Sequence, residues 1–267
     1  MKAIEDLKVT LVQSIQHWED IDGNLGMFEE KLWQFNDPTD LIILPEMFTT
    51  GFSMNARKLA EVKGLKTMRW LEQMASQKKA MIMGSFIAND GGKFYNRMIA
   101  MKPDGSFHQY DKRHPFSLAE EDKTYTGGKE KVVFNLNGWK ICPMICYDLR
   151  FPVWSRNVYS KGELEYDILI YVANWPAPRV NAWDTLLAAR AIENMSYCVG
   201  VNRVGKDEKG HQYLGHSAVY DFGGKKTFYN EGEEVIETAT LDYSALTDFR
   251  KKFGFFLDAD SFTIHDM

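Results

Sequence analysis

Three side chains with reactive potential stand directly beyond apolar or stiff segments of the sequence. Glu46 follows the run LIILP, Lys112 follows Tyr-Asp, and Cys146 follows the run WKICPMI. A carboxylate in such a place can act as a general base, and a lysine can stabilise negative charge that develops on a substrate oxygen. A cysteine thiolate can act as a nucleophile. Since α/β proteins place their sites at the carboxyl ends of strands, these positions are candidates for catalysis.

Each candidate also has an ordinary structural interpretation. Glu46 could cap a helix or lie at the surface, and Lys112 could belong to a solvated basic turn, YDKRHPF. Cys146 could be a small buried hydrophobe, as free cysteines often are. If it lies where a strand meets a helix, nearby backbone N–H dipoles would favour its thiolate. Cys142 and Cys198 lie within apolar runs and are predicted to pack in strands.

An acidic cluster, Glu120-Glu121-Asp122, follows shortly after Lys112. By default it is a solvated loop, but adjacent carboxylates repel, so one of them can turn inward toward a cation. No histidine stands in a HExxH motif or pairs with cysteine at a finger spacing, and no Gly-rich phosphate loop or GxSxG motif occurs. The sequence therefore predicts no metal and no cofactor.

Strands that alternate with helices must position these side chains. Strands are expected at 8–15, 41–44, 80–87, 97–101, 132–136, 139–145, 167–173, 197–203, 219–222 and 235–241, and helices at 24–35, 65–78, 152–161, 183–194 and 243–252. Asn137-Gly138 predicts a tight hairpin, because both turn positions need positive φ. No linker divides the chain, so residues 1–267 are expected to form one α/β domain with two largely covered, mixed sheets.

Composition narrows the function further. The net charge of −5 gives no basic balance for nucleic acid or anionic lipid. No run of about 18 apolar residues occurs, and the first twenty residues carry charges throughout, so neither a membrane span nor a signal peptide is expected. Three cysteines are too few for a disulfide framework, which favours the reducing cytoplasm.

Taken together, the motifs resemble the nitrilase superfamily, the carbon–nitrogen hydrolases with a Glu-Lys-Cys triad. The resemblance covers nearly the whole chain. The occurrence of all these motifs together and in this order is far more specific than any one of them. The resembling segments are VTLVQ in the first strand, LPEMFTTGF (44–52), YNR (95–97), YDKRHPF (110–116), GWKICPMICYDLRFPVW (138–154), YVANWPAPR (171–179), LLAARAIENMSYCVGVNRVG (186–205) and KKFGFFLDAD (251–260). The stretches CYDLRFPVW and VANWPAPR most resemble the bacterial omega-amidase branch.

The resemblance implies a role for each reactive residue. Cys146 would be the nucleophile, and Glu46 the general base that takes its proton and later activates water. Lys112 would stabilise the tetrahedral intermediate together with the backbone N–H of Tyr147, and its charge would lower the pKa of the thiol.

A second glutamate, which orients the lysine and the substrate, is also implied. In the family it precedes a glycine by seven residues, which selects Glu121 before Gly128, with Glu120 as the fallback. The surrounding SLAEEDKTYTGG matches the family pattern only loosely.

The omega-amidase resemblance further implies hydrolysis of small dicarboxylic-acid monoamides, such as 2-oxoglutaramate or succinamate, to the acid and ammonia through a cysteine thioester. Arg150 or Arg113 could bind the free carboxylate of the substrate, whereas Arg179 and Arg203 are expected to be structural. The residues that could shape a short pocket are Phe116, Tyr147, Phe151 and Trp175, with core packing as an alternative for Trp175.

The expected fold is the superfamily's four-layer α-β-β-α sandwich. Subunits are expected to form a homodimer or higher homo-oligomer, which the aromatic tail of about 253–267 could help to join. Other members of the superfamily, namely a nitrilase, a carbamoylase or a deaminated-glutathione amidase, remain alternatives. A non-catalytic binding protein on the same fold is the alternative from another class.

Overall fold

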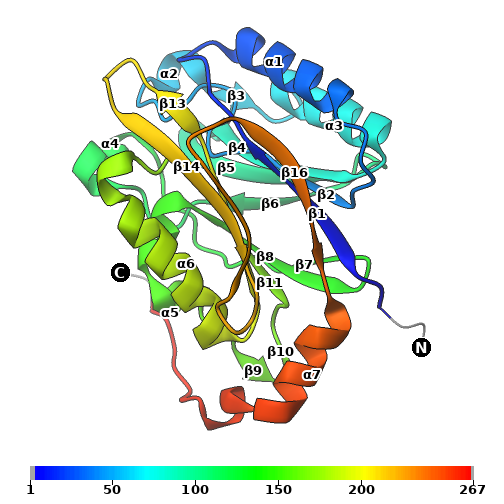
Figure 1. Ribbon diagram of the computed structural model, residues 1–267. Helices are drawn as coiled ribbons and strands as arrows, with labels where there is room; N and C mark the ends of the chain where they lie inside the picture. Colours follow the sequence, from blue (N-terminus) through cyan, green and yellow to red (C-terminus); the bar gives the residue numbers. More distant parts are fainter. Residues whose placement is uncertain (1–3, 266–267) are drawn as a thin grey trace.

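Two mixed β-sheets lie face to face between layers of helices (Figure 1). The computed structural model describes residues 4–265, so residues 1–3 and 266–267, at the ends of the expected domain and tail, lie outside the described residues. The predicted fold class, the four-layer α-β-β-α sandwich, is confirmed. None of the helices described between these limits is long and apolar enough to cross a membrane.

The strands have the following bounds: β1 (Leu7–Gln13), β2 (Leu41–Ile43), β3 (Glu61–Val62), β4 (Met81–Asp90), β5 (Lys93–Met101), β6 (Phe107–Asp111), β7 (Phe134–Leu136), β8 (Trp139–Ile145), β9 (Tyr159–Ser160), β10 (Glu163–Leu164), β11 (Ile168–Ala173), β12 (Tyr197–Asn202), β13 (Val204–Lys206), β14 (Gln212–Tyr220), β15 (Lys226–Glu231) and β16 (Val235–Leu241). The α-helices are α1 (Ile21–Gln34), α2 (Ala56–Leu59), α3 (Lys66–Lys78), α4 (Glu121–Thr124), α5 (Pro152–Ser155), α6 (Val180–Asn194) and α7 (Tyr243–Phe253). Short 3-10 helices span Ser117–Ala119, Cys146–Arg150, Ala177–Arg179 and Phe255–Asp258.

The first sheet has the order β16-β1-β2-β4-β5-β6, with β3 paired to β4, and the second has the order β13-β14-β12-β11-β8-β7, with β15 paired to β14. The central pairs β1–β2 and β2–β4, and β8–β11 and β11–β12, are parallel, as is the short pair β3–β4. The other pairs of the two sheets are antiparallel. Parallel strands end at the same edge, so each sheet brings the residues that follow its central strands together.

Strand β2 shows why the sheets are covered on both faces. Leu41 and Ile43 point into the core between the two sheets, whereas Ile42 and Leu44 pack with α1 and α3 on the outer face. This two-residue period converts an unbroken apolar run into two buried faces. On the far side of the second sheet, α6 adds Trp183 and other side chains to the same core (Figure 1).

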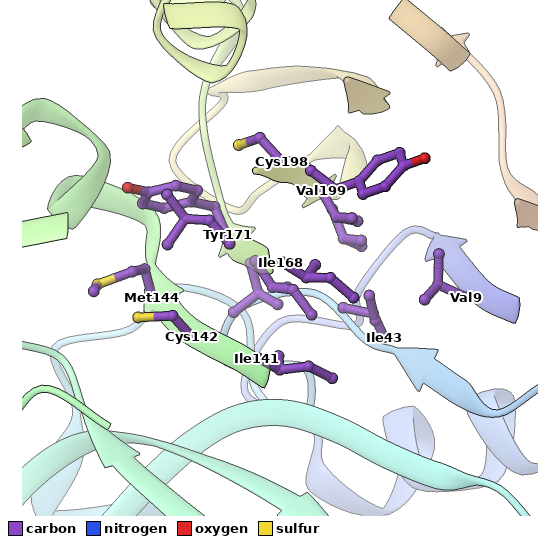
Figure 2. Packing of buried hydrophobic residues seen from close by; sticks show 14 of the residues in the cluster. Val9, Ile43, Ile141, Cys142, Met144, Ile168, Tyr171, Cys198 and Val199 are labelled. Atoms are coloured by element: carbon purple, nitrogen blue, oxygen red, sulfur yellow. The ribbon is translucent and has the colours of Figure 1, made fainter. Parts of the chain in front are cut away.

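The core on the α6 side of the second sheet contains two of the cysteines, Cys142 and Cys198. Figure 2 shows the sulfur atoms of Cys142 and Cys198 pointing away from Val9 and Ile43 of the first sheet, whereas Ile141 and Ile168 of the second sheet lie toward them. Both thiols are fully buried and carry no disulfide. Burial raises the pKa of Cys142 to about 12, which is typical of an inert core thiol.

Two local expectations need correction. The helix expected at 152–161 is wrong, because α5 ends at Ser155 and the chain then turns into a short hairpin, β9–β10, with positive φ at Lys161 and Gly162. The strand expected at 219–222 is the end of a longer strand, β14, which pairs with an unexpected strand, β15. The Asn137-Gly138 hairpin is confirmed, with both residues at positive φ.

Candidate active site

Four of the predicted site residues come together where strands of both sheets end. Glu46 stands three residues beyond β2 of the first sheet, and Lys112 follows β6 of the same sheet. Cys146 follows β8 of the second sheet, and Glu121 begins α4 in the loop after Lys112. The structure thus unites residues that are up to 100 positions apart in the sequence.

An ion cluster forms the floor of this site. Lys112 Nζ donates to Glu46 Oε1 at 3.0 Å and to Glu121 Oε2 at 2.8 Å. All three side chains are shielded from solvent, with Glu46 and Glu121 at 0% exposure and Lys112 at 2%. One ammonium between two carboxylates leaves an excess of negative charge, and the mutual attraction holds all three side chains in place.

The neighbouring residue Glu120 lies on the other side of the chain. It is exposed and pairs with Lys123, whereas Glu121 accepts the Phe116 N–H at 2.6 Å in addition to its bonds from Lys112. The acidic cluster therefore turns one carboxylate, that of Glu121, inward and leaves Glu120 and Asp122 exposed, as expected from the repulsion between adjacent acids.

Two asparagines to which the sequence analysis gave no role orient Glu46. Asn96 Nδ2 donates to Glu46 Oε1 at 2.8 Å and reaches Glu121 Oε1 at 3.4 Å. The Asn174 backbone N–H donates to Glu46 Oε2 at 2.7 Å, and its side chain holds the Glu46 carbonyl at 2.6 Å. The available signal was a polar residue in or directly after a buried strand, in the segments YNR and YVANW.

The backbone is strained at the two turns that present the acid and the thiol. Cys146 has φ +45° and Met47, next to Glu46, has φ +43°, a region that non-glycine residues rarely adopt. The Met47 N–H is held by Ser85 Oγ at 2.9 Å. Strain of this kind costs about 1–3 kcal/mol and persists only where the surroundings enforce it.

Asp148 enforces the turn at Cys146. Its buried carboxylate accepts the Ile145 N–H at 3.0 Å and the Tyr110 hydroxyl at 2.7 Å. It also accepts the His114 N–H at 3.0 Å and contacts His114 Nδ1 at 2.8 Å. Through these bonds Asp148 links the segment that contains Cys146 to the segment that contains Lys112.

The electrostatics differ from the expectation for a thiolate at rest. Burial raises the pKa of the Cys146 thiol well above its usual range, and the Glu46 charge raises it further. Lys112 lowers this pKa as expected, but burial and two carboxylates outweigh one ammonium. Burial alone would lower the pKa of Lys112, but Glu121 and Glu46 raise it above its ordinary value. The resting site therefore holds a neutral thiol beside a charged lysine.

Glu121 feels opposing effects. Burial raises the pKa of its carboxyl group, Lys112 lowers it, and the net direction is upward. Because the direct bonds from Lys112 and Phe116 favour the carboxylate, the buried pair is held by geometry as well as by charge.

Cys146 and Lys112 line a cavity of about 280 Å³. Four predicted pocket residues, Phe116, Tyr147, Arg150 and Trp175, line it, and so does Arg179, which was expected to be structural. The remaining lining residues are Phe52, Met54, Leu118, Ala119, Asn174, Pro176, Asp207, Lys209, His211 and Tyr213.

Three other candidates do not line this cavity. Phe151 stacks on His114 with 3.9 Å between the ring centroids, so it packs against a residue that neighbours the site and not against the cavity itself. Arg113 donates to the Gly128 carbonyl and lies over Trp154, and the residues that line the cavity do not include it. Arg203 is buried and donates to backbone carbonyls, as a structural residue would.

Within residues 4–265, no group of three or more His, Cys, Asp or Glu side chains could hold a metal ion. The chemistry open to the described site is that of a nucleophile, a base and an oxyanion-stabilising cation.

Comparisons with known proteins agree with this geometry. A model of the carbon-nitrogen hydrolase family matches residues 8–251. The chain belongs to the carbon-nitrogen hydrolase family, which is the nitrilase superfamily inferred from the motifs.

Individual members of this family to which the chain is similar are the following. The chain is 44% identical to "Omega-amidase YafV" of Yersinia enterocolitica over 97% of this chain and 98% of the relative. It is 34% identical to "2-oxoglutaramate amidase" of Bacillus subtilis over 82% and 84% of the two chains. The crystal structure of XC1258 from Xanthomonas campestris, described as a CN-hydrolase superfamily protein, superposes with a TM-score of 0.96 at 40% identity, covering 98% of this chain and 100% of that one.

Proposed function

We propose that this protein is an omega-amidase. It hydrolyses the terminal amide of small dicarboxylic-acid monoamides, such as 2-oxoglutaramate and succinamate, to the acid and ammonia. The observation that supports this most directly is the buried Glu46–Lys112–Glu121 cluster beside a thiol in a small cavity. Relatives whose names specify an omega-amidase and a 2-oxoglutaramate amidase support the choice of substrate class.

In the first half of the proposed reaction, Cys146 attacks the amide carbonyl. Because its pKa is raised, the sulfur keeps its proton at rest, and Glu46 takes that proton as the carbon–sulfur bond forms. The oxygen that becomes negative is stabilised by the Lys112 ammonium and the Tyr147 backbone N–H. Glu46 then returns the proton to the leaving nitrogen, and ammonia departs from a thioester.

Water completes the proposed reaction. Glu46 takes a proton from a water molecule, whose oxygen attacks the thioester carbonyl. The carbon–sulfur bond breaks, the sulfur recovers a proton from Glu46, and the acid is released. Glu121 positions Lys112 throughout, since its two oxygens lie 2.8 and 3.1 Å from the Nζ atom.

The roles can be tested by exchanging one thiol at a time. Cys146→Ala should abolish ammonia release from 2-oxoglutaramate, whereas Cys198→Ala, which alters a core thiol away from the cavity, should leave turnover measurable. Ammonia release that survives Cys146→Ala would contradict the nucleophile assignment.

The substrate class needs a panel compared by kcat/KM. It should contain 2-oxoglutaramate, succinamate, a nitrile of similar length and an N-carbamoyl compound. We expect the two monoamides to be the fastest substrates. Faster turnover of the nitrile or of the carbamoyl compound would replace the omega-amidase by another activity of the superfamily.

We further propose that residues 1–267 form one catalytic domain that pairs into a homodimer in the reducing cytoplasm. Exposed apolar side chains near the C-terminus, including Phe255 at 60% and Leu257 at 63% exposure, support a subunit contact there. Three cysteines without a disulfide support the compartment. A monomer by light scattering at micromolar concentration would contradict the pairing.

A further inference from the structure

Asn96 contacts all three members of the buried ion cluster. It lies on β5 and is 2% exposed. Its side-chain Nδ2 donates to Glu46 Oε1 at 2.8 Å and reaches Glu121 Oε1 at 3.4 Å. Its backbone carbonyl accepts the Lys112 N–H at 3.0 Å. A neutral residue is therefore in direct contact with three buried charged residues.

Asn96 and Lys112 share the same two acceptors. Lys112 Nζ lies 3.0 Å from Glu46 Oε1 and 3.1 Å from Glu121 Oε1, which are the two oxygens that Asn96 Nδ2 contacts. Two carboxylates that share a buried site repel each other, and one ammonium neutralises only one of them. The amide of Asn96 has two N–H hydrogens, so it offers one to each glutamate without adding charge to the cluster.

The orientation of the Asn96 amide follows from these contacts. Turning the amide over would place Oδ1 against two carboxylate oxygens. In the observed orientation, Oδ1 is buried and accepts no hydrogen bond from residues 4–265. An unpaired buried oxygen is unfavourable, so the contacts that hold this side chain are those of Nδ2. The next residue, Arg97, pairs with Asp111 at 2.7 Å and so fastens β5 to β6, the strand that leads to Lys112.

The two carboxylate oxygens of Glu46 have different surroundings. Oε1 accepts hydrogen bonds from both Lys112 and Asn96. Among the residues that the structure describes, Oε2 accepts one hydrogen bond, from the Asn174 N–H at 2.7 Å. Since a carboxylate oxygen has two lone pairs, Oε2 keeps one of them for a proton. The residues that line the cavity do not include Asn96, so any effect of Asn96 on the reaction passes through its charged neighbours.

We propose that Asn96 is a positioning residue for Glu46. It holds Glu46 Oε1 beside Lys112, so that Oε2 is the oxygen that exchanges protons during the reaction. The proposal rests on the proposed function and extends it. The proton of the Cys146 thiol moves to Oε2 and from there to the leaving nitrogen, while Asn96 neither gains nor loses a proton. Lys112 has three N–H hydrogens, so one stays available for the substrate oxygen when Glu46 and Glu121 each take one.

The test compares Asn96→Ala with Asn96→Asp in the hydrolysis of 2-oxoglutaramate. Asn96→Ala should lower kcat about 10- to 100-fold with KM within about threefold, because it frees the proposed base without altering the cavity wall. Asn96→Asp places a third carboxylate beside two others, but its protonated form can donate an O–H to them. Its kcat/KM, divided by that of the parent protein at the same pH, should therefore rise about tenfold or more from pH 9 to pH 5.5. The same ratio should not rise for Asn96→Ala.

Asn89→Asp is the matched control, because it makes the same exchange on the neighbouring strand β4, where Asn89 Oδ1 accepts the Gly92 N–H. Its kcat/KM should stay within about threefold of the parent protein at each pH. An Asn96→Ala protein with kcat within threefold of the parent, a loss confined to KM, or an Asn96→Asp ratio that does not rise toward acidic pH would overturn the positioning role. If Asn96→Ala does not fold, the Asn96→Asp ratios decide alone. A parent protein that hydrolyses no monoamide would overturn the proposed function and this proposal together.

Discussion

Replacing Glu121 by glutamine tests how the reactive lysine is held. Both carboxylate oxygens of Glu121 accept hydrogen bonds: one from Lys112 and the Phe116 N–H, the other from Lys112 and Asn96. The amide of Glu121→Gln must turn its NH₂ group toward one of these donor pairs. Either orientation leaves buried donors facing each other and removes one of the two counter-charges of Lys112.

The magnitude follows from burial. At 2.8 Å and an effective dielectric constant of about 20, the attraction between Lys112 and Glu121 is about 6 kcal/mol, partly offset by desolvation. Removing one partner of a buried pair typically costs about 3–5 kcal/mol. For a chain of this size, Tm should fall by about 6–20 °C. Since Lys112 is the proposed oxyanion donor, kcat/KM should also fall about 10²–10³-fold.

Glu120→Gln is the matched control, because the two glutamates are adjacent and only one faces inward. Glu120 is exposed and pairs with Lys123, so this variant should keep the Tm and the activity of the parent protein. The assays are differential scanning calorimetry and ammonia release from 2-oxoglutaramate. A Glu121→Gln protein with unchanged Tm and with kcat/KM within twofold of the parent would refute the reasoning, as would a larger effect at Glu120.

Three further outcomes are expected. Gly128→Ala should prevent folding or lower Tm strongly, because its Cβ would lie 2.1 Å from a backbone oxygen, whereas Gly26→Ala, with open space in a helix, should raise stability by about 0.5–1 kcal/mol in urea unfolding. Asp148→Asn should lower kcat by up to about 10²-fold in steady-state kinetics, since it loosens the turn at the proposed nucleophile; an unchanged kcat would contradict this. The folded-state pKa of Cys142, raised to about 12 from 9.0, gives stability that is present below pH 9 and lost as pH rises toward 12, up to about 4 kcal/mol. Cys142→Ala should therefore cost less stability at pH 11 than at pH 8, and an equal cost at both would refute the pKa argument.

Local patterns in the sequence predicted most of the fold. The apolar run at β2, the Asn137-Gly138 turn and the helical spacing of α3 each depend on neighbours in the chain, so they could be inferred without a structure. The helix expected at 152–161 failed because buried contacts, such as those of Asn157 with Tyr166 and Asn194, direct the chain away from a helix. Contacts of this kind leave no periodic pattern of apolar residues in the sequence.

The reactive types and their positions were also visible in the sequence. Glu46 and Cys146 follow apolar strands, and the order of the motifs indicated the family to which the chain belongs. The charge state of the thiol could not be inferred in the same way. It depends on burial and on the number of carboxylates around Cys146, and both are set by packing.

By itself, then, the sequence determined where strands end and which reactive groups stand there, because turn chemistry and side-chain period act over a few residues. Only the tertiary structure decided which residues bond to the reactive groups and which residues line the cavity. Asn96 and Asn174 reach Glu46 across 50 and 128 positions of the chain, and Arg179 instead of Arg113 lines the cavity. Hydrogen bonds and cavities of this kind arise where separate elements meet, and that meeting depends on the packing of two sheets, which no local pattern encodes.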